Sequence, residues 1–157
     1  MSPPPVRFPV CLLLAVGLGV ACTPFRVVTP AGLVELPDQA PAYDYRATSP
    51  DGLVLAVRAI DHEPRGDLAF WEKTIERRLR LQGGYALLET RSVKAKSGLS
   101  GRQLRFGHDE GASPHLYLLT LFVDDDHIFL VEAGGPKELV EQEASKIDAF
   151  VERFEVR

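Results

Sequence analysis

Two turn sequences, each flanked by apolar runs, most constrain the fold of this 157-residue chain. The first turn, Ser49-Pro50-Asp51-Gly52, separates residues 43–47 from the apolar run 53–60. The second, residues 124–126, is three aspartates between the apolar runs 115–123 and 127–133. Proline presets the backbone of a turn, and glycine takes the left-handed conformation at low cost. Each sequence therefore predicts a β-hairpin, so antiparallel strand pairs must form much of the domain.

Two amphipathic patterns predict helices that cover this sheet. The first begins at Asp67, a good N-cap, and runs to about Gln82, before the pair Gly83-Gly84. The second follows Pro136 and runs toward the C-terminus. We expect each to bury one apolar stripe: Leu68, Trp71, Ile75 and Leu79 in the first helix, and Val140, Ala144, Ile147, Val151 and Phe154 in the second.

The remaining apolar patterns predict strands over residues 85–94 and 101–106, followed by a polar loop over 107–113. We expect Gly134-Gly135-Pro136 to end the sheet. The run 53–60 is apolar almost throughout, which favours a central strand covered on both faces. The order is β-β-α-β-β-β-β-α, so the predicted fold class is α+β, with a predominantly antiparallel sheet covered by helices.

The composition is that of an ordinary globular domain, with 45% hydrophobic and 25% charged residues. The 18 Lys+Arg and 22 Asp+Glu give a formal net charge of -4. A protein that binds nucleic acid through a strongly basic surface is therefore not expected.

The first 21 residues read as a secretory signal peptide. Arg7 precedes an apolar run over residues 8–21, which is shorter than the roughly 20 residues needed to cross a bilayer. The run ends in Leu18-Gly19-Val20-Ala21-Cys22, which resembles the lipobox of bacterial lipoproteins. The resemblance implies cleavage before Cys22, loss of Cys11, and attachment of acyl chains to Cys22. A plain cleaved signal and a short buried helix are the alternatives.

A lipidated Cys22 implies a protein anchored to a membrane of the bacterial cell envelope, because two or three acyl chains hold a protein stably. Thr23 follows where an aspartate often retains lipoproteins at the inner membrane, so the resemblance favours the outer membrane. Prolines at positions 24, 30, 37 and 41 make residues 22–41 a predicted tether, whose last part could lie against the domain as an edge strand. We therefore expect the domain proper over residues 42–157.

The domain resembles the PsbP-like fold. The resemblance is carried by the Ser-Pro-Asp-Gly hairpin, the helix that contains Trp71, the run Gly98-Leu99-Ser100-Gly101 before a strand, the paired strands around residues 124–126, and the final helix. This fold occurs in an extrinsic subunit of the photosynthetic oxygen-evolving complex, a Ran-binding nuclear import factor, and periplasmic lipoproteins of the DcrB type. It implies an α/β/α sandwich and a role in binding proteins or assisting assemblies, with no shared catalytic residues.

The sequence contains no recognised catalytic or metal-binding signature. Residues 61–63, 108–110 and 124–127 combine carboxylates with histidines, but none has the ligand spacing of a known metal site. The run Gly98-Leu99-Ser100-Gly101 precedes a strand, whereas a nucleophile elbow follows one. We therefore expect no enzyme activity, no bound metal and no cofactor.

Arg77, Arg78 and Arg80 are the candidate partner-binding residues. They lie on the first predicted helix among residues of both signs, a pattern also typical of a solvated face. The expected function is that of a non-enzymatic protein-binding or accessory module, held at the membrane by its lipid anchor and serving an envelope protein. The alternative is an envelope lipoprotein that binds a small molecule or a metal.

Overall fold

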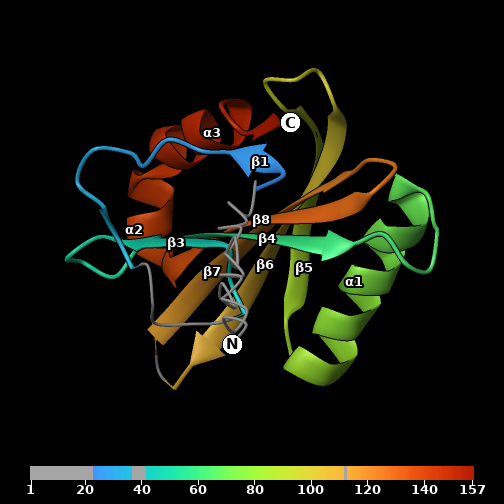
Figure 1. The fold of residues 1–157 in the computed structure, drawn as a ribbon. Helices are drawn as coiled ribbons and strands as arrows, with labels where there is room; N and C mark the ends of the chain where they lie inside the picture. Colours follow the sequence, from blue (N-terminus) through green and yellow to red (C-terminus); the bar gives the residue numbers. More distant parts are fainter. Residues whose placement is uncertain (1–22, 37–41, 112) are drawn as a thin grey trace, which may run out of the picture.

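A seven-stranded antiparallel sheet forms the middle layer of the protein (Figure 1). The computed structural model describes residues 23–36, 42–111 and 113–157. The order across the sheet is β2-β3-β4-β8-β7-β6-β5. The strands are β2 (Val34–Glu35), β3 (Tyr45–Thr48), β4 (Val54–Asp61), β5 (Ala86–Lys94), β6 (Ser100–Glu110), β7 (Ser113–Val123) and β8 (His127–Pro136).

Helices cover both faces of the sheet. Helix α1 (Leu68–Gly83) lies on one face, and α2 (Lys137–Gln142) and α3 (Ala144–Glu152) lie on the other (Figure 1). The expected α+β fold and its α/β/α layering are therefore confirmed. The C-terminal helix that we expected to be continuous is divided into α2 and α3 at Glu143.

Local signals for turns and helix ends were accurate. Gly52 has φ 97° in the first hairpin, and the three aspartates connect β7 to β8. The Asp67 carboxylate accepts a hydrogen bond from the Phe70 N–H at 2.7 Å, which caps α1. At the other end Gly84 has φ 68°, and its N–H donates to the Leu79 carbonyl. These ends need little tertiary information because one or two residues fix each of them.

Two strands are longer than the sequence predicted. The segment expected as a polar loop over 107–113 is largely paired: β6 runs to Glu110, with His108 opposite His115 on β7. Strand β8 continues through the glycines that we expected to end the sheet, because Gly134 pairs with Val54 on one side and Tyr117 on the other. Backbone hydrogen bonding to established neighbours extends both strands regardless of side-chain polarity.

Part of the predicted tether belongs to the folded body. Strand β1 (Phe25–Arg26) pairs with β9 (Glu155–Val156), and Phe25 is buried with its ring 5.7 Å from that of Phe154. Strand β2 pairs with β3 at one edge of the sheet, as expected for the last part of the tether. The domain therefore begins near Pro24, earlier than the expected residue 42.

The predicted signal peptide and Cys22 lie outside the described residues. Within the part of the chain that the structure describes, no helix combines the length and apolar content required to cross a membrane.

The two faces of the sheet are buried to different extents. On the α2/α3 face a large core contains Phe122, Phe129 and Phe154, all fully buried. On the α1 face a smaller core includes Leu104, Phe106 and Leu119. No residue of α1 itself is fully buried. The stripe Leu68, Trp71, Ile75 and Leu79 faces the sheet as predicted, but these side chains are half-buried.

The position of α1 explains this difference. The helix packs on β5, β6 and β7, whereas β8, β4 and β3 extend beyond it (Figure 1). Strand β4 is central, as predicted, but its end is open: Arg58 is half-buried and Ile60 is exposed. One side of α1 and the adjoining part of the sheet therefore face an incompletely filled space.

Candidate functional site: a cleft beneath α1

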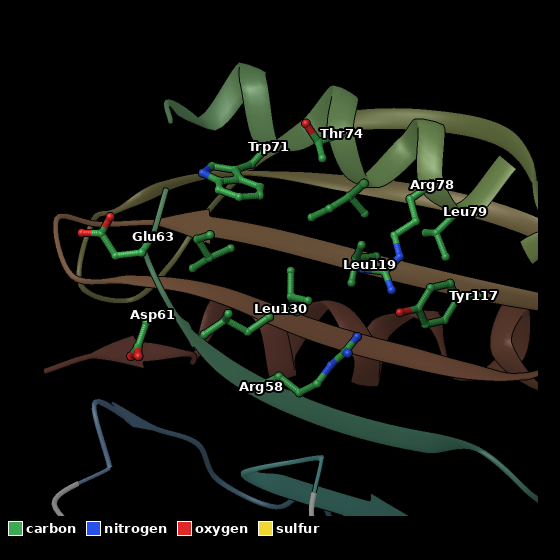
Figure 2. A pocket seen from close by; sticks show the side chains of 13 residues that line it. Arg58, Asp61, Glu63, Trp71, Thr74, Arg78, Leu79, Tyr117, Leu119 and Leu130 are labelled. Atoms are coloured by element: carbon green, nitrogen blue, oxygen red, sulfur yellow. The ribbon is translucent and has the colours of Figure 1, made fainter. Parts of the chain in front are cut away.

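A cleft of about 430 Å³ lies between α1 and strands β4, β7 and β8 (Figure 2). Its walls are formed by the half-buried stripe of α1, and its floor by the sheet. The apolar lining consists of Ile60, Trp71, Ile75, Leu79, Leu119, Ile128 and Leu130. The remaining lining residues are Arg58, Asp61, Glu63, Thr74, Arg78 and Tyr117.

A buried carboxylate ties three strands together beside this floor. Glu132 on β8 is 7% exposed. Its Oε1 accepts a hydrogen bond from Arg58 Nε on β4 at 2.6 Å, and its Oε2 accepts one from the Tyr117 hydroxyl on β7 at 2.7 Å. Strand register produces the arrangement, because Arg58 pairs with Leu130 and Tyr117 with Gly134, which places all three side chains on the α1 face.

This network raises the pKa values of Tyr117 and Arg58. Burial, the nearby Glu132 carboxylate and the hydrogen bond to it raise the pKa of the Tyr117 hydroxyl far above its ordinary value. Burial opposes the charge on Arg58, but the Glu132 carboxylate outweighs that effect and raises the pKa of the guanidinium. The Tyr43 ring lies 5.4 Å from the Arg58 guanidinium carbon and adds a cation–π contact. At neutral pH the Tyr117 hydroxyl therefore keeps its proton, and Arg58 keeps its positive charge.

The two ends of the cleft differ in charge. Asp61 and Glu63 lie near Trp71 at one end, and Arg78 extends from α1 toward Tyr117 at the other (Figure 2). No carboxylate lies within ion-pair distance of Arg78 among the residues that the structure describes. Glu132 binds Arg58 through Nε, and its other oxygen accepts from Tyr117. The terminal amino groups of Arg58 and the guanidinium of Arg78 are therefore the hydrogen-bond donors that the site offers to a ligand. The arrangement suits a group with an apolar body and one acidic end.

The three predicted partner-binding arginines do not share a surface. Arg78 lines the cleft, whereas Arg77 and Arg80 line a separate hollow near Lys73 and Tyr85 on the β5 side of α1. Arg80 also pairs with Glu76 at 3.0 Å. Because successive helical residues are about 100° apart, adjacent arginines point to opposite flanks of α1.

The acidic and histidine-containing loops have structural roles. His62 is buried; its Nδ1 lies 2.7 Å from the Asp124 carbonyl oxygen, and its Nε2 lies 2.8 Å from the Gly66 carbonyl oxygen and 3.0 Å from the Gly66 nitrogen. The His62 side chain thus links the loop around residues 61–63 to the backbone of the loop around residues 124–127. His108 lies at the opposite end of the sheet, with its ring 4.7 Å from that of Tyr85. The described residues include no group of three or more His, Cys, Asp or Glu side chains arranged to hold a metal ion.

The network of Arg58, Glu132 and Tyr117 was not predicted from the sequence. A signal was present, since Arg58 and Glu132 are charged residues within runs otherwise predicted to be buried. Buried charges are normally paired. Identifying the partners required the order and register of β4, β8 and β7, which the sequence did not provide.

Comparison with solved structures identifies the fold. The chain is similar to LpqN of Mycobacterium tuberculosis, described as involved in cell envelope biogenesis, with a TM-score of 0.69 and 12% identity over 84% of this chain and 82% of LpqN. It is similar to the cyanobacterial PsbP protein CyanoP of Synechocystis, with a TM-score of 0.59 and 12% identity over 85% and 87% of the two chains.

A third similar structure is the Ran-binding protein Mog1p of Saccharomyces cerevisiae, with a TM-score of 0.58 and 14% identity over 85% of this chain and 90% of Mog1p. No family model and no curated protein sequence matches the chain. The chain therefore has the PsbP/Mog1 fold, as the sequence analysis predicted. At these identities the similarity shows the fold alone and assigns no functional residues.

Proposed function

We propose that this protein is a non-enzymatic binding module of the bacterial cell envelope, and that it holds a protein partner in the cleft beneath α1. The envelope assignment is supported by the N-terminal signal pattern ending at Cys22 and by the similarity to LpqN, an envelope biogenesis protein. Lipid anchoring at Cys22, with a preference for the outer membrane, is part of the proposal.

The observation that carries the binding proposal is the cleft itself. Its apolar floor remains open because α1 packs mainly on β5, β6 and β7, and the adjoining Arg58 is fixed by a buried carboxylate. A preorganised donor loses little conformational entropy on binding, so such a site favours a ligand that supplies the missing acceptor. The proposed protein partner inserts an apolar side chain over Leu119 and Leu130 and places a neighbouring carboxylate near Arg78.

A second candidate function is the binding of a small amphipathic molecule with one acidic group. The volume of about 430 Å³ favours it, because small-molecule pockets typically measure roughly 300–1,000 Å³. The two candidates share one site and one ligand chemistry, so a single set of variants tests both.

The test compares two tryptophan substitutions on the same helix. Thr74 lines the cleft and Ala69 does not, while both are exposed. The full chain is expressed in its native host and purified from detergent-solubilised envelope, and its bound proteins and small molecules are identified by mass spectrometry. We expect Thr74→Trp and Arg78→Glu to lose a stoichiometric component that Ala69→Trp retains.

The nature of the lost component separates the two candidates. A protein supports the first, and a small acidic amphiphile supports the second. A bound component that survives both Thr74→Trp and Arg78→Glu would contradict the cleft as the binding site.

A further inference from the structure

Strand β5 leaves one long edge of the sheet open. It is the terminal strand on its side, nine residues long, and Leu88, Glu89, Thr90, Arg91 and Ser92 are all exposed. The opposite edge ends in β2, which has two residues. In the described part of the chain, no backbone bond outside the sheet engages residues 86–94. An open edge of this length is a template for another strand.

The hydrogen-bond pattern shows which residues of β5 direct their backbone outward. The Ala95 N–H donates to the Leu99 carbonyl at 2.9 Å, so residues 95 and 99 form a hydrogen-bonded pair. Antiparallel pairs alternate between hydrogen-bonded and non-hydrogen-bonded. In the register of β5 and β6, residues 89, 91 and 93 therefore bond inward, and Thr90, Ser92 and Lys94 present their N–H and C=O groups to the open edge.

The α3 side of this edge carries a projection and a hollow. Leu88 sits at the bulge of β5 and is 58% exposed. A Cβ added to Gly107 would lie 3.3 Å from Leu88 Cδ1, which places the leucine on the α2/α3 face. A hollow of about 440 Å³ lies a few residues along the same strand, lined on that face by Val93 and, from α3, by Val151.

The charges along this edge complement those of an identical strand that runs in the opposite direction. Glu89 and Arg91 precede and follow Thr90 in the sequence, and both side chains lie on the α2/α3 face. Arg91 bonds Gln103 at 2.7 Å and pairs with Asp148, whereas Glu89 has no ion pair among the described residues. A strand of the same sequence running antiparallel, with Thr90 opposite Thr90, would place Glu89 of each copy opposite Arg91 of the other.

We propose that a second copy of this chain pairs along β5, on a two-fold axis at Thr90, to join the two sheets into one. In this arrangement Leu88 of each copy lies opposite Ser92 of the other, beside the hollow lined by Val93 and Val151. The two Glu89–Arg91 pairs and the two Leu88–Ser92 contacts are repeated by symmetry, as an isologous interface requires. This inference does not depend on the cleft or on the proposed function.

Other registers lack this complementarity. An axis at Arg91 would place the two arginines directly opposite each other, which is destabilising. An axis at Ser92 also pairs outward-facing residues, but it places Arg91 opposite Val93 and gives Glu89 no cation from the other copy. Of these three registers, the axis at Thr90 is therefore the one that places opposite charges next to each other across the interface.

The first test measures the monomer–dimer equilibrium of the full chain in detergent by light scattering. We expect a dimer whose dissociation constant rises at least tenfold with Glu89→Arg, because arginine would then face Arg91. The matched variant Glu138→Arg, on the exposed surface of α2, should leave the constant unchanged. Thr90→Pro should also dissociate the dimer, since it removes an outward N–H, whereas Thr90→Ala should not.

The second test fixes the register and does not require a proline in the strand. In the full chain with Cys11 and Cys22 replaced by serine, Thr90→Cys should form an intermolecular disulfide on mild oxidation, because hydrogen-bonded antiparallel partners have Cα atoms about 5.5 Å apart. Ser92→Cys should crosslink much more slowly. A chain that stays monomeric up to about 1 mM, or crosslinking that favours Ser92→Cys, would overturn the proposal.

Discussion

Glu132 is a carboxylate within an apolar strand, and its two oxygens hold side chains from the strands on either side. Removing it would leave Arg58 and Tyr117 without their acceptor in a largely buried setting. We expect Glu132→Ala to lower the free energy of unfolding by about 2 kcal/mol, a value below that of a fully buried pair because Arg58 is one-third exposed. Urea denaturation measures the change, and Glu138→Ala on exposed α2 should alter it by less than about 0.5 kcal/mol.

Tyr117 predicts how stability depends on alkaline pH. Its pKa in the folded chain lies far above the ordinary 10.0 because of burial and the Glu132 carboxylate. Above pH 10 the unfolded chain loses this proton while the folded chain keeps it, so the stability present below pH 10 declines as pH rises. A single such group contributes a slope of about 1.4 kcal/mol per pH unit.

The measurement is urea denaturation of the wild-type chain and Tyr117→Phe from about pH 8 to about pH 11. The variant should be less stable at neutral pH, because it lacks the hydrogen bond to Glu132, but should lose less stability above pH 10. Equal slopes for the two proteins would contradict the assignment of alkaline sensitivity to Tyr117.

At the scale of secondary structure, the N-terminus of α1 determines one wall of the cleft. Asp67 caps the helix four residues before Trp71, the chain's one tryptophan. We expect Asp67→Ala to destabilise the protein by about 1 kcal/mol and to shift Trp71 fluorescence toward that of a more solvated indole. Asp67→Asn should preserve both properties, since asparagine also caps well. An unchanged unfolding midpoint in Asp67→Ala would show that the cap does not hold this wall.

Elements fixed by nearby residues were predictable, and those fixed by distant partners were not. The ends of α1 and both hairpin turns depend on single residues such as Asp67 and Gly52. The extension of β6 to Glu110 and the pairing of β1 with β9 depend on strands remote in the sequence. The 3.6-residue period correctly identified the face of α1 toward the sheet. It contains no information on how far the helix sits from the centre of that sheet, so the half-burial of Trp71 and the cleft were missed.

At the scale of the whole molecule, incomplete coverage of the sheet leaves two separate surfaces. The cleft lies where α1 ends its coverage toward β8 and β4, and the open edge of β5 lies on the other side of the helix (Figure 1). Pairing through β5 would leave both clefts accessible. If Cys22 anchors each copy to one membrane, the shared surface raises the effective concentration and favours even a weak dimer.

The most direct test of the binding account is site-specific photocrosslinking in living cells of the native host. A photoreactive amino acid is placed at Thr74, inside the cleft, or at Ala69, on the same helix outside it. We predict a defined crosslinked product from Thr74 that is absent from Ala69 and is lost when Arg78→Glu is added. The same product from both positions, or no product from Thr74, would contradict the claim that the cleft beneath α1 is where this protein holds its ligand.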